Sequence, residues 1–463
     1  MQPKKSDCQR SFLCPDLLDQ LNPRNHLLGL AKVIPWQVFE DNFRQLYAAS
    51  GRPGKSVQLM VVLPILKQLE NLSDERVVEA WVQNLYFQAF CGQQRFTWKL
   101  PCDLSELTYF RRRIGEDGVR KIFEVAVALH DDKAKDAEVV VDSTVREKNI
   151  SFPTDAKLLT KIVTRCHTMA KLEDVKLRRS YQREIKSLLQ TIRFKSKGRR
   201  QGESQRAVRR LRTIAGILVR ELKRKLSPEA LTIHQQALDL YDRVQRQQRS
   251  DTGKIYSLHE PGASCISKGK AHKKYEFGAK ASVTVTKTSG IIVGALSFQD
   301  NPFDGHTLPA VLSQVESIVG RRTTMAICDQ GYRGKRKIGV TSIEIPESGR
   351  RTKTASDKRQ ARERFRRRAA IEPIIGHLKN DHRMLRNYLK DQIGDTVNLF
   401  MACAAFNFRK FIRILRFLCL RFLGKYFDQM FSPNRSVPEV AFKEFFKMEN
   451  LTKNYCIVIY CKL

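Results

Sequence analysis

The sequence lacks the cysteine pairs that build zinc sites and disulfide frameworks. Its 11 cysteines are scattered through 463 residues, and no two of them form a Cys-x-x-Cys pair. A zinc ribbon or zinc finger therefore has no set of ligands here. The opening residues also lack the apolar run of a signal peptide. Because the number of cysteines is odd as well, we expect free thiols in a reducing cytoplasm.

The sequence also lacks an uninterrupted apolar stretch of the length that a membrane span needs, about 20 residues. Its longest apolar region, 399–423, is broken by five basic residues: Arg409, Lys410, Arg413, Arg416 and Arg421. The apolar residues recur at helical spacing with a basic opposite face, which predicts a helix facing a core. A helix lying on a membrane surface is the alternative.

Acidic residues are few relative to basic ones. The chain has 48 Asp and Glu against 84 Lys and Arg, a net charge of +36. Such a surplus repels itself in a compact protein and is best tolerated beside a polyanion, so nucleic acid is the leading partner class. Apolar residues make up 42%, which excludes a wholly disordered chain. A basic binder of the ribosomal or chromatin type fits the composition equally well.

The first part of the chain has helical patterns. Ser73, followed by two acids, predicts the N-cap of a helix over 75–90 that ends at Cys91-Gly92. Ser105 is the expected cap of a short helix that carries three consecutive arginines, 111–113. These arginines either place a helix on DNA or form an ordinary solvated face.

A strand and a strongly basic helical region come next. The β-branched segment 137–145 predicts a buried strand that ends at Asp142. Long helices are expected from about 155 to 250. Within them, residues 178–224 contain 16 basic and 3 acidic residues, a net charge of +13. This pattern indicates either a helical hairpin lying along a phosphate backbone or a solvated coiled-coil hairpin.

The hydrophobic period switches to two at Tyr275. Residues 275–298 predict two strands joined by a turn at 287–290. A helix follows at 304–320, and a short apolar strand then ends at Asp329. A last helix holds Glu372. The order predicts a mixed α/β fold with a helical insertion after the first strand.

Three carboxylates stand out by their context. Asp142 and Asp329 each follow apolar strand residues, and Glu372 lies on a helix beside isoleucines. A carboxylate at the end of a buried strand is costly unless it is paired or bound to metal. Three such groups could hold two Mg²⁺ ions for phosphodiester chemistry. Taken singly, each acid fits a turn former or a helix-surface residue equally well.

The last block of the chain resembles a family signature. Phe365-x₂-Arg368-x₃-Glu372-x₆-Lys379 resembles the Tyr-x₂-Arg-x₃-Glu-x₆-Lys signature of bacterial insertion-sequence DDE transposases, specifically the insertion sequence five family. Phe365 departs from the signature, where the family has Tyr. The blocks VVVDSTV, EKNISFPTDAKL, DGHTL and ICDQGYRG resemble that family's other blocks, in the same order.

The resemblance covers roughly residues 40 to 415 and implies an RNase H-like core. Asp142, Asp329 and Glu372 are the implied catalytic triad, which would bind two Mg²⁺ ions, with Mn²⁺ as a substitute. The expected organisation is an N-terminal arm at 1–40, a helical domain for DNA-end binding at 41–130, a catalytic domain at 131–415 with a helical insertion at about 155–255, and a C-terminal tail at 416–463.

A basic tract precedes the glutamate helix. Residues 349–368 include ten basic and two acidic residues, which suits contact with a DNA backbone. Arg368 and Lys379 are expected to grip phosphates near the cut, although an Arg368–Glu372 helix salt bridge is the alternative. The full set of expected DNA-binding residues is Arg333, Arg364, Arg366, Arg367, Arg368 and Lys379.

The resemblance implies a reaction in two steps. The enzyme would hydrolyse DNA at the terminal inverted repeats of its element, and the freed 3′-hydroxyl would then attack target DNA. Joining two ends calls for a homodimer or a larger assembly on double-stranded DNA, at the nucleoid and without a membrane. A catalytically inactive descendant that only binds DNA is the alternative function. The tail after about residue 424 is either an extension or a small dimer contact.

Overall fold

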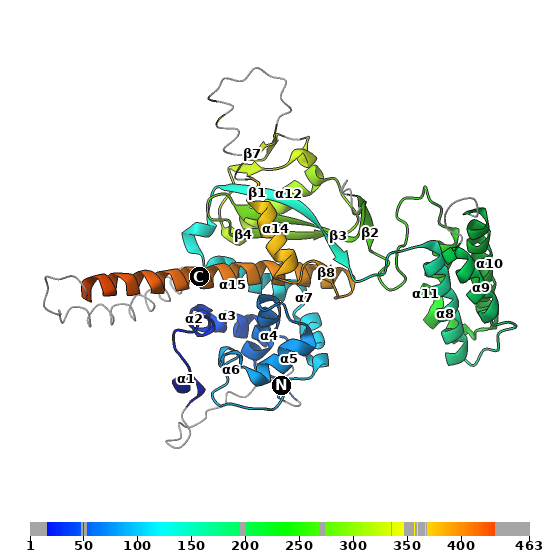
Figure 1. The fold of residues 1–463 in the computed structure, drawn as a ribbon, viewed down its shortest axis with the longest axis horizontal. Coiled ribbons are helices and arrows are strands. Elements are labelled where there is room, and N and C mark those ends of the chain that lie inside the picture. The colour runs from blue at the N-terminus through cyan, green and yellow to red at the C-terminus, as the bar shows by residue number, and fades with distance from the viewer. Residues whose placement is uncertain are drawn as a thin grey trace.

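The computed structural model describes residues 16–47, 53–194, 201–267, 274–334, 336–346 and 368–430, with the single positions 50, 356, 359 and 366. Side chains are described up to residue 417. A long helix, α15 (Asp391–Met430), runs through the middle of the molecule. Small helices lie on one side of α15 and a sheet lies on the other, while a helical bundle stands apart from both (Figure 1).

The N-terminal part is built from helices around apolar residues that join the main core. Its helices are α1 (Leu17–Gln20), α2 (His26–Val33), α3 (Trp36–Arg44), α4 (Val57–Leu69), α5 (Asp74–Gln83), α6 (Leu85–Phe90) and α7 (Leu104–Ala128). Ser73 caps α5 as predicted, because its side chain accepts a hydrogen bond from the Arg76 amide. The single helix predicted over 75–90 was wrong. Asn84 ends α5 and its side chain caps α6.

Helix α7 also differs from the prediction of a short helix capped by Ser105. Asp103 is the N-cap, in a capping box with Glu106. The helix continues for 25 residues because Gly115 absorbs a kink at φ +59°, a conformation that a side chain would disfavour. The 3₁₀ turn η1 (Asp131–Ala134) then leads to the sheet.

The sheet is mixed. Its strands are β1 (Glu138–Lys148), β2 (Ser264–Ser267), β3 (Tyr275–Thr286), β4 (Ile292–Phe298), β5 (Met325–Ile327), β6 (Lys337–Ile338), β7 (Thr341–Glu344) and β8 (Arg386–Asn387). The main order is β2-β3-β1-β5-β7-β6, with β4 beside β3 and β8 beside β1. The predicted hairpin is confirmed, since β3 and β4 pair antiparallel. The prediction that the first strand ends at Asp142 was wrong, because pairing with β3 carries β1 on to Lys148.

Among the described residues, four helices lie between β1 and β2. They are α8 (Asp155–Leu172), α9 (Gln182–Phe194), α10 (Gln201–Lys225) and α11 (Pro228–Arg246). Their buried side chains, such as Ile162, Leu218 and Leu238, form a hydrophobic cluster separate from the main core. The bundle therefore has its own source of stability, and it projects beyond the end of the sheet (Figure 1).

The apolar region 399–423 lies in α15. Residues Leu399 to Ala405 and Phe408 are buried in the main core, so the prediction of a core-facing helix is confirmed for this part of the region. Phe417 is 63% exposed, and the side chains of 418–423 lie outside the described residues. Within the described ranges, no helix has the length and apolar character needed to cross a membrane. On the sheet side, α12 (Asp304–Val319) and α14 (Ile371–Asn380) complete the core.

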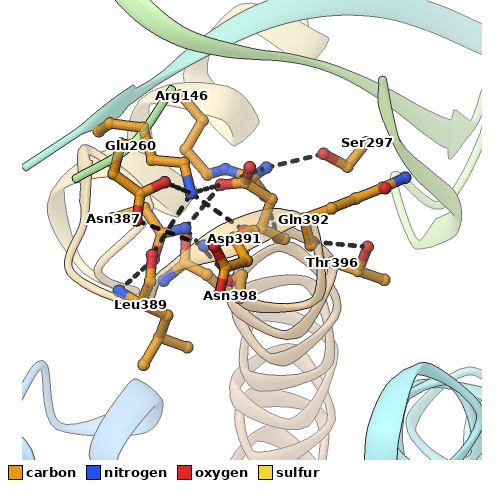
Figure 2. Close-up of polar contacts among 12 residues, drawn as sticks. Arg146, Glu260, Ser297, Asn387, Leu389, Asp391, Gln392, Thr396 and Asn398 are labelled. Atoms are coloured by element: carbon orange, nitrogen blue, oxygen red, sulfur yellow. Dashed lines mark hydrogen bonds and ion pairs between the residues drawn. The ribbon is translucent and has the colours of Figure 1, made fainter. Parts of the chain in front are cut away.

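A buried polar network joins the end of β1 to the start of α15 (Figure 2). The Lys148 ammonium lies 3.0 Å from carboxylate oxygens of both Glu260 and Asp395. The Arg146 guanidinium lies 3.2 Å from Asp395 Oδ1 and donates to Ser297 Oγ at 2.8 Å. Asn387 Nδ2 donates to Asp395 Oδ1 at 2.7 Å. Two cations and two anions therefore neutralise each other inside the fold.

Removing one charge from this network should destabilise the fold strongly. Replacing Asp395 with Ala leaves Arg146 and Lys148, both buried, with one anion between them. We expect the free energy of unfolding to fall by about 3–5 kcal/mol in urea denaturation. Asp132→Ala is the control, because its side chain is 91% exposed. Equal unfolding midpoints for the two variants would contradict the prediction.

Two buried histidines should make stability depend on pH. Burial lowers the pKa of both His382 and His130 from 6.5 to about 4. The His382 ring donates a hydrogen bond to the Gln68 carbonyl. Between these two pH values the unfolded chain binds protons more readily than the folded protein. The stability that each neutral histidine contributes is therefore fully present above pH 6.5 and is lost as the pH falls toward 4. We expect each histidine to cost about 2 kcal/mol at pH 5. Urea midpoints for His382→Gln should show a smaller loss between pH 7 and pH 5 than the parent protein; an equal loss would refute this origin.

Candidate active site

Asp142 and Asp329 are brought together by strand register. Strand β1 pairs in parallel with β5, so that Val140 lies opposite Ile327. Asp142 and Asp329 each come two residues after this pair, at the edge where β5 ends. Both residues are partly buried. Because parallel neighbours advance at the same rise per residue, the register places the two aspartates side by side.

The sheet opens at this position. After Ile327, β5 no longer accompanies β1, and β8 takes a place beside β1 at Glu147 and Lys148. Among the described strands, none pairs with β1 on this side between Asp142 and Arg146. The two aspartates therefore lie at the point where the pairing of β1 with β5 ends.

Asp329 starts a tight 3₁₀ turn, η3 (Gln330–Tyr332). Its Oδ1 accepts a hydrogen bond from the Gly331 amide at 2.8 Å. A Cβ on Gly331 would lie 3.0 Å from Asp329 Oδ1 and 3.1 Å from Asp304 Oδ2. The carboxylate of Asp304 therefore lies next to that of Asp329, and glycine at 331 leaves the space between them open.

Asp304 is paired with a lysine from the middle of a strand. Lys280 Nζ, on β3, lies 3.0 Å from Asp304 Oδ1 and donates to the Pro302 carbonyl at 2.7 Å. Both side chains are largely buried, 9% and 20% exposed. Sequence reasoning did not select either residue. The available signals were the DGHTL block and a lysine in the interior of a predicted strand.

Glu372 lies in the first turn of α14, whose Ile371 and Leu378 are fully buried. Its side chain is 64% exposed and lies 3.7 Å from Arg368 Nη2. The structure thus contains the helix salt bridge that the sequence raised as an alternative. Such a contact on an exposed helix is worth only a few tenths of a kcal/mol.

The electrostatics of Cys328 show which charges surround this edge. Burial raises the pKa of the Cys328 thiol, and the negative charges of Asp329, Asp142 and Asp304 raise it further. The Arg368 guanidinium lowers it. Three aspartates and Arg368 therefore act on one buried point between the strands.

The described residues include no group of three His, Cys, Asp or Glu side chains close enough to hold a metal ion. Asp142 on β1 and Asp329 after β5 follow the same register pair, while Glu372 contacts Arg368. Of the expected DNA-binding residues, Arg364 and Arg367 lie outside the described residues. Arg333 and Arg366 are exposed, and Arg368 and Lys379 are partly buried. Arg333 follows the aspartate turn directly and donates to Gln330 Oε1 at 3.2 Å.

Comparisons with known proteins give a consistent result. A transposase domain model (DUF772) matches residues 15–113, and a transposase DDE domain model matches residues 247–408. An uncharacterized protein of Rhizobium meliloti, ORF8 in the nfe locus, is 40% identical over 192 residues, which is 40% of this chain and 93% of that protein. No solved structure matches the chain at a significant level.

Together the two domain matches span more than half of the chain. The chain belongs to the DDE transposases of insertion sequences. It is therefore a transposase, a protein class that acts on DNA with divalent metal ions. The DDE domain match begins after the helical bundle. Asp142, on β1, lies before that match and is brought to Asp329 by the fold.

The contact between Arg368 and Glu372 predicts that Arg368 competes with a metal ion for the Glu372 carboxylate. In Arg368→Ala, a positive charge near the carboxylates is removed, so we expect Mn²⁺ affinity without DNA to rise roughly tenfold. We expect affinity for duplex DNA to fall. Calorimetric Mn²⁺ titration and DNA anisotropy measure the two effects.

The matched control is Arg76→Ala, which removes an exposed arginine from a 3.5 Å helix pair with Glu79. Arg76→Ala should change the Mn²⁺ affinity and the DNA affinity much less than Arg368→Ala does. If Arg368→Ala behaves like this control in both titrations, then Arg368 only stabilises its helix.

Proposed function

We propose that this transposase cuts DNA at the ends of its own insertion sequence and joins the freed 3′-hydroxyl to target DNA. The observation that carries the proposal is the pairing of β1 with β5, which makes Asp142 and Asp329 neighbours. We also propose that the core is RNase H-like. The order β4-β3-β1-β5-β7, with β3 antiparallel to β1 and β5 and β7 parallel to it, supports this assignment.

The donor set suits a hard divalent cation such as Mg²⁺, since carboxylate oxygens are its preferred protein ligands. Asp304 is paired with Lys280, and Asp142 and Asp329 follow the last residue pair of β1 and β5. We propose that these two residues and Glu372 hold the metal ions, two Mg²⁺ with Mn²⁺ as a substitute. When bound, the ions would lower the pKa of water and stabilise charge on the phosphate. To bind the metal, the Glu372 carboxylate would have to leave its contact with Arg368.

The side chains around this edge suit phosphate binding. Arg368 is placed to turn from Glu372 to a phosphate with two parallel hydrogen bonds. Arg333 and Lys379 would bind the neighbouring phosphates of the DNA backbone through their positive charges. Water would first attack the phosphorus at the element end, which releases the 3′-hydroxyl. That hydroxyl would then attack target phosphorus and displace a second 3′-oxygen, so that no covalent protein intermediate is needed.

The second candidate function is DNA binding without catalysis. The Arg368–Glu372 contact favours it, because Glu372 is engaged by a cation of the chain itself. The two functions differ in one experiment: strand transfer by the purified protein on a labelled duplex that carries the element ends.

We expect joined products that require Mg²⁺ or Mn²⁺. Asp329→Asn should abolish cutting and joining, because it removes a metal ligand, and should leave DNA affinity nearly unchanged. Asp300→Asn is the control, since Asp300 is an exposed residue outside the aspartate turn. Binding without cutting or joining, in both metals, would support the inactive descendant.

A further inference from the structure

A second candidate contact with DNA lies in the N-terminal helices, in the loop between α6 and α7. Phe96 and Trp98 are 47% and 75% exposed. Their rings form an edge contact, with centroids 6.0 Å apart. Leu100 beside them is 60% exposed. Large apolar side chains in this number are seldom left in water without a partner.

The loop is firmly held below these rings. Gln88 is fully buried. Its amide donates to the Thr97 carbonyl at 2.8 Å and accepts from the Thr97 amide at 3.0 Å. The Leu17 amide also donates to the Gln94 carbonyl at 2.7 Å, and Cys102 is buried. The backbone is thus anchored between the two aromatic residues, which leaves their rings to project outward.

The charge around the rings indicates the partner. Arg95 and Lys99 flank the aromatic pair, both exposed, and residues 92–102 contain no acid. A second copy of this chain, with net charge +36, would bring like charge to the loop. A nucleic acid brings phosphates for the cations and flat bases for the rings. Base stacking on exposed aromatic side chains is tolerant of sequence and contributes substantially to affinity.

We propose that Trp98 and Phe96 form a stacking site for an unpaired DNA base, with Arg95 and Lys99 on its phosphates. Bases inside a duplex do not offer their faces, so the ligand is a single-stranded flank or a frayed end. The choice of DNA as ligand rests on the proposed function. The site itself is separate from the aspartates, since the N-terminal helices lie across α15 from the sheet (Figure 1).

The tryptophans of the chain provide a direct readout. There are three: Trp81 is fully buried, and Trp36 is partly buried and donates to the Ala31 carbonyl. Iodide should therefore quench mainly Trp98. We expect a single-stranded octamer of thymidylate to quench this fluorescence and to protect it from iodide. A blunt duplex of mixed sequence should do so much less.

Substitutions distinguish the contribution of base stacking to octamer affinity from the contribution of positive charge. By anisotropy of labelled octamer, Trp98→Ala should weaken binding by about tenfold, while Trp98→Phe should keep most of the affinity. Leu100→Ala is the matched control, an exposed apolar residue without a ring, and should bind normally. Trp98→Ala should leave the salt dependence of binding unchanged, whereas Arg95→Ala and Lys99→Ala should each reduce it.

The proposal is overturned if the octamer binds without quenching Trp98, or if Trp98→Ala binds it as tightly as the parent. Equal quenching by the blunt duplex would also overturn it. A change in sedimentation of free Trp98→Ala, with normal octamer affinity, would assign the loop to a protein contact instead. Asp329→Asn should retain the quenching. If the protein cuts and joins DNA but the octamer does not quench Trp98 fluorescence, only the stacking site is refuted. If the octamer quenches Trp98 but no DNA is cut or joined, only the proposed reaction is refuted.

Discussion

The buried ion network at the end of β1 is the constraint on which the rest of the structure depends. Lys148 contacts Glu260, which follows the helical bundle, and Asp395, which opens α15. Arg146 reaches Ser297 on β4. The network therefore ties three separate stretches of chain to one strand. A group of buried charges that balance one another tolerates few alternative arrangements, whereas apolar contacts alone can slide.

This constraint acts directly on the candidate active site. Asp142, Arg146 and Lys148 lie on the same face of β1, because side chains alternate along a strand. A slip of one residue would turn all three to the opposite face. The pairs that hold Arg146 and Lys148 therefore also fix the direction of the Asp142 carboxylate. The segment that returns from the helical bundle to the sheet is held at Glu260 by Lys148.

Local chemistry predicted much of the fold. The β3–β4 hairpin, the Ser73 cap and the core-facing α15 all followed from patterns within a few residues. One error arose where a partner far along the chain decides the outcome, and others arose where a nearby polar side chain begins or ends a helix. Strand β1 continues past Asp142 because β3 and β8 pair with it. Asn84 divides one apolar run into two helices, since its side chain can cap the second.

The candidate site shows the same limit. Asp142 and Asp329 could be selected because each follows a run of strand residues, and register then makes them neighbours. Asp304 and Lys280 could not be selected in this way, because their significance is a 3.0 Å contact between a helix and a strand. That contact removes one negative charge from a cluster of three aspartates. Lys280 therefore lowers the negative charge at the candidate site without belonging to the expected triad.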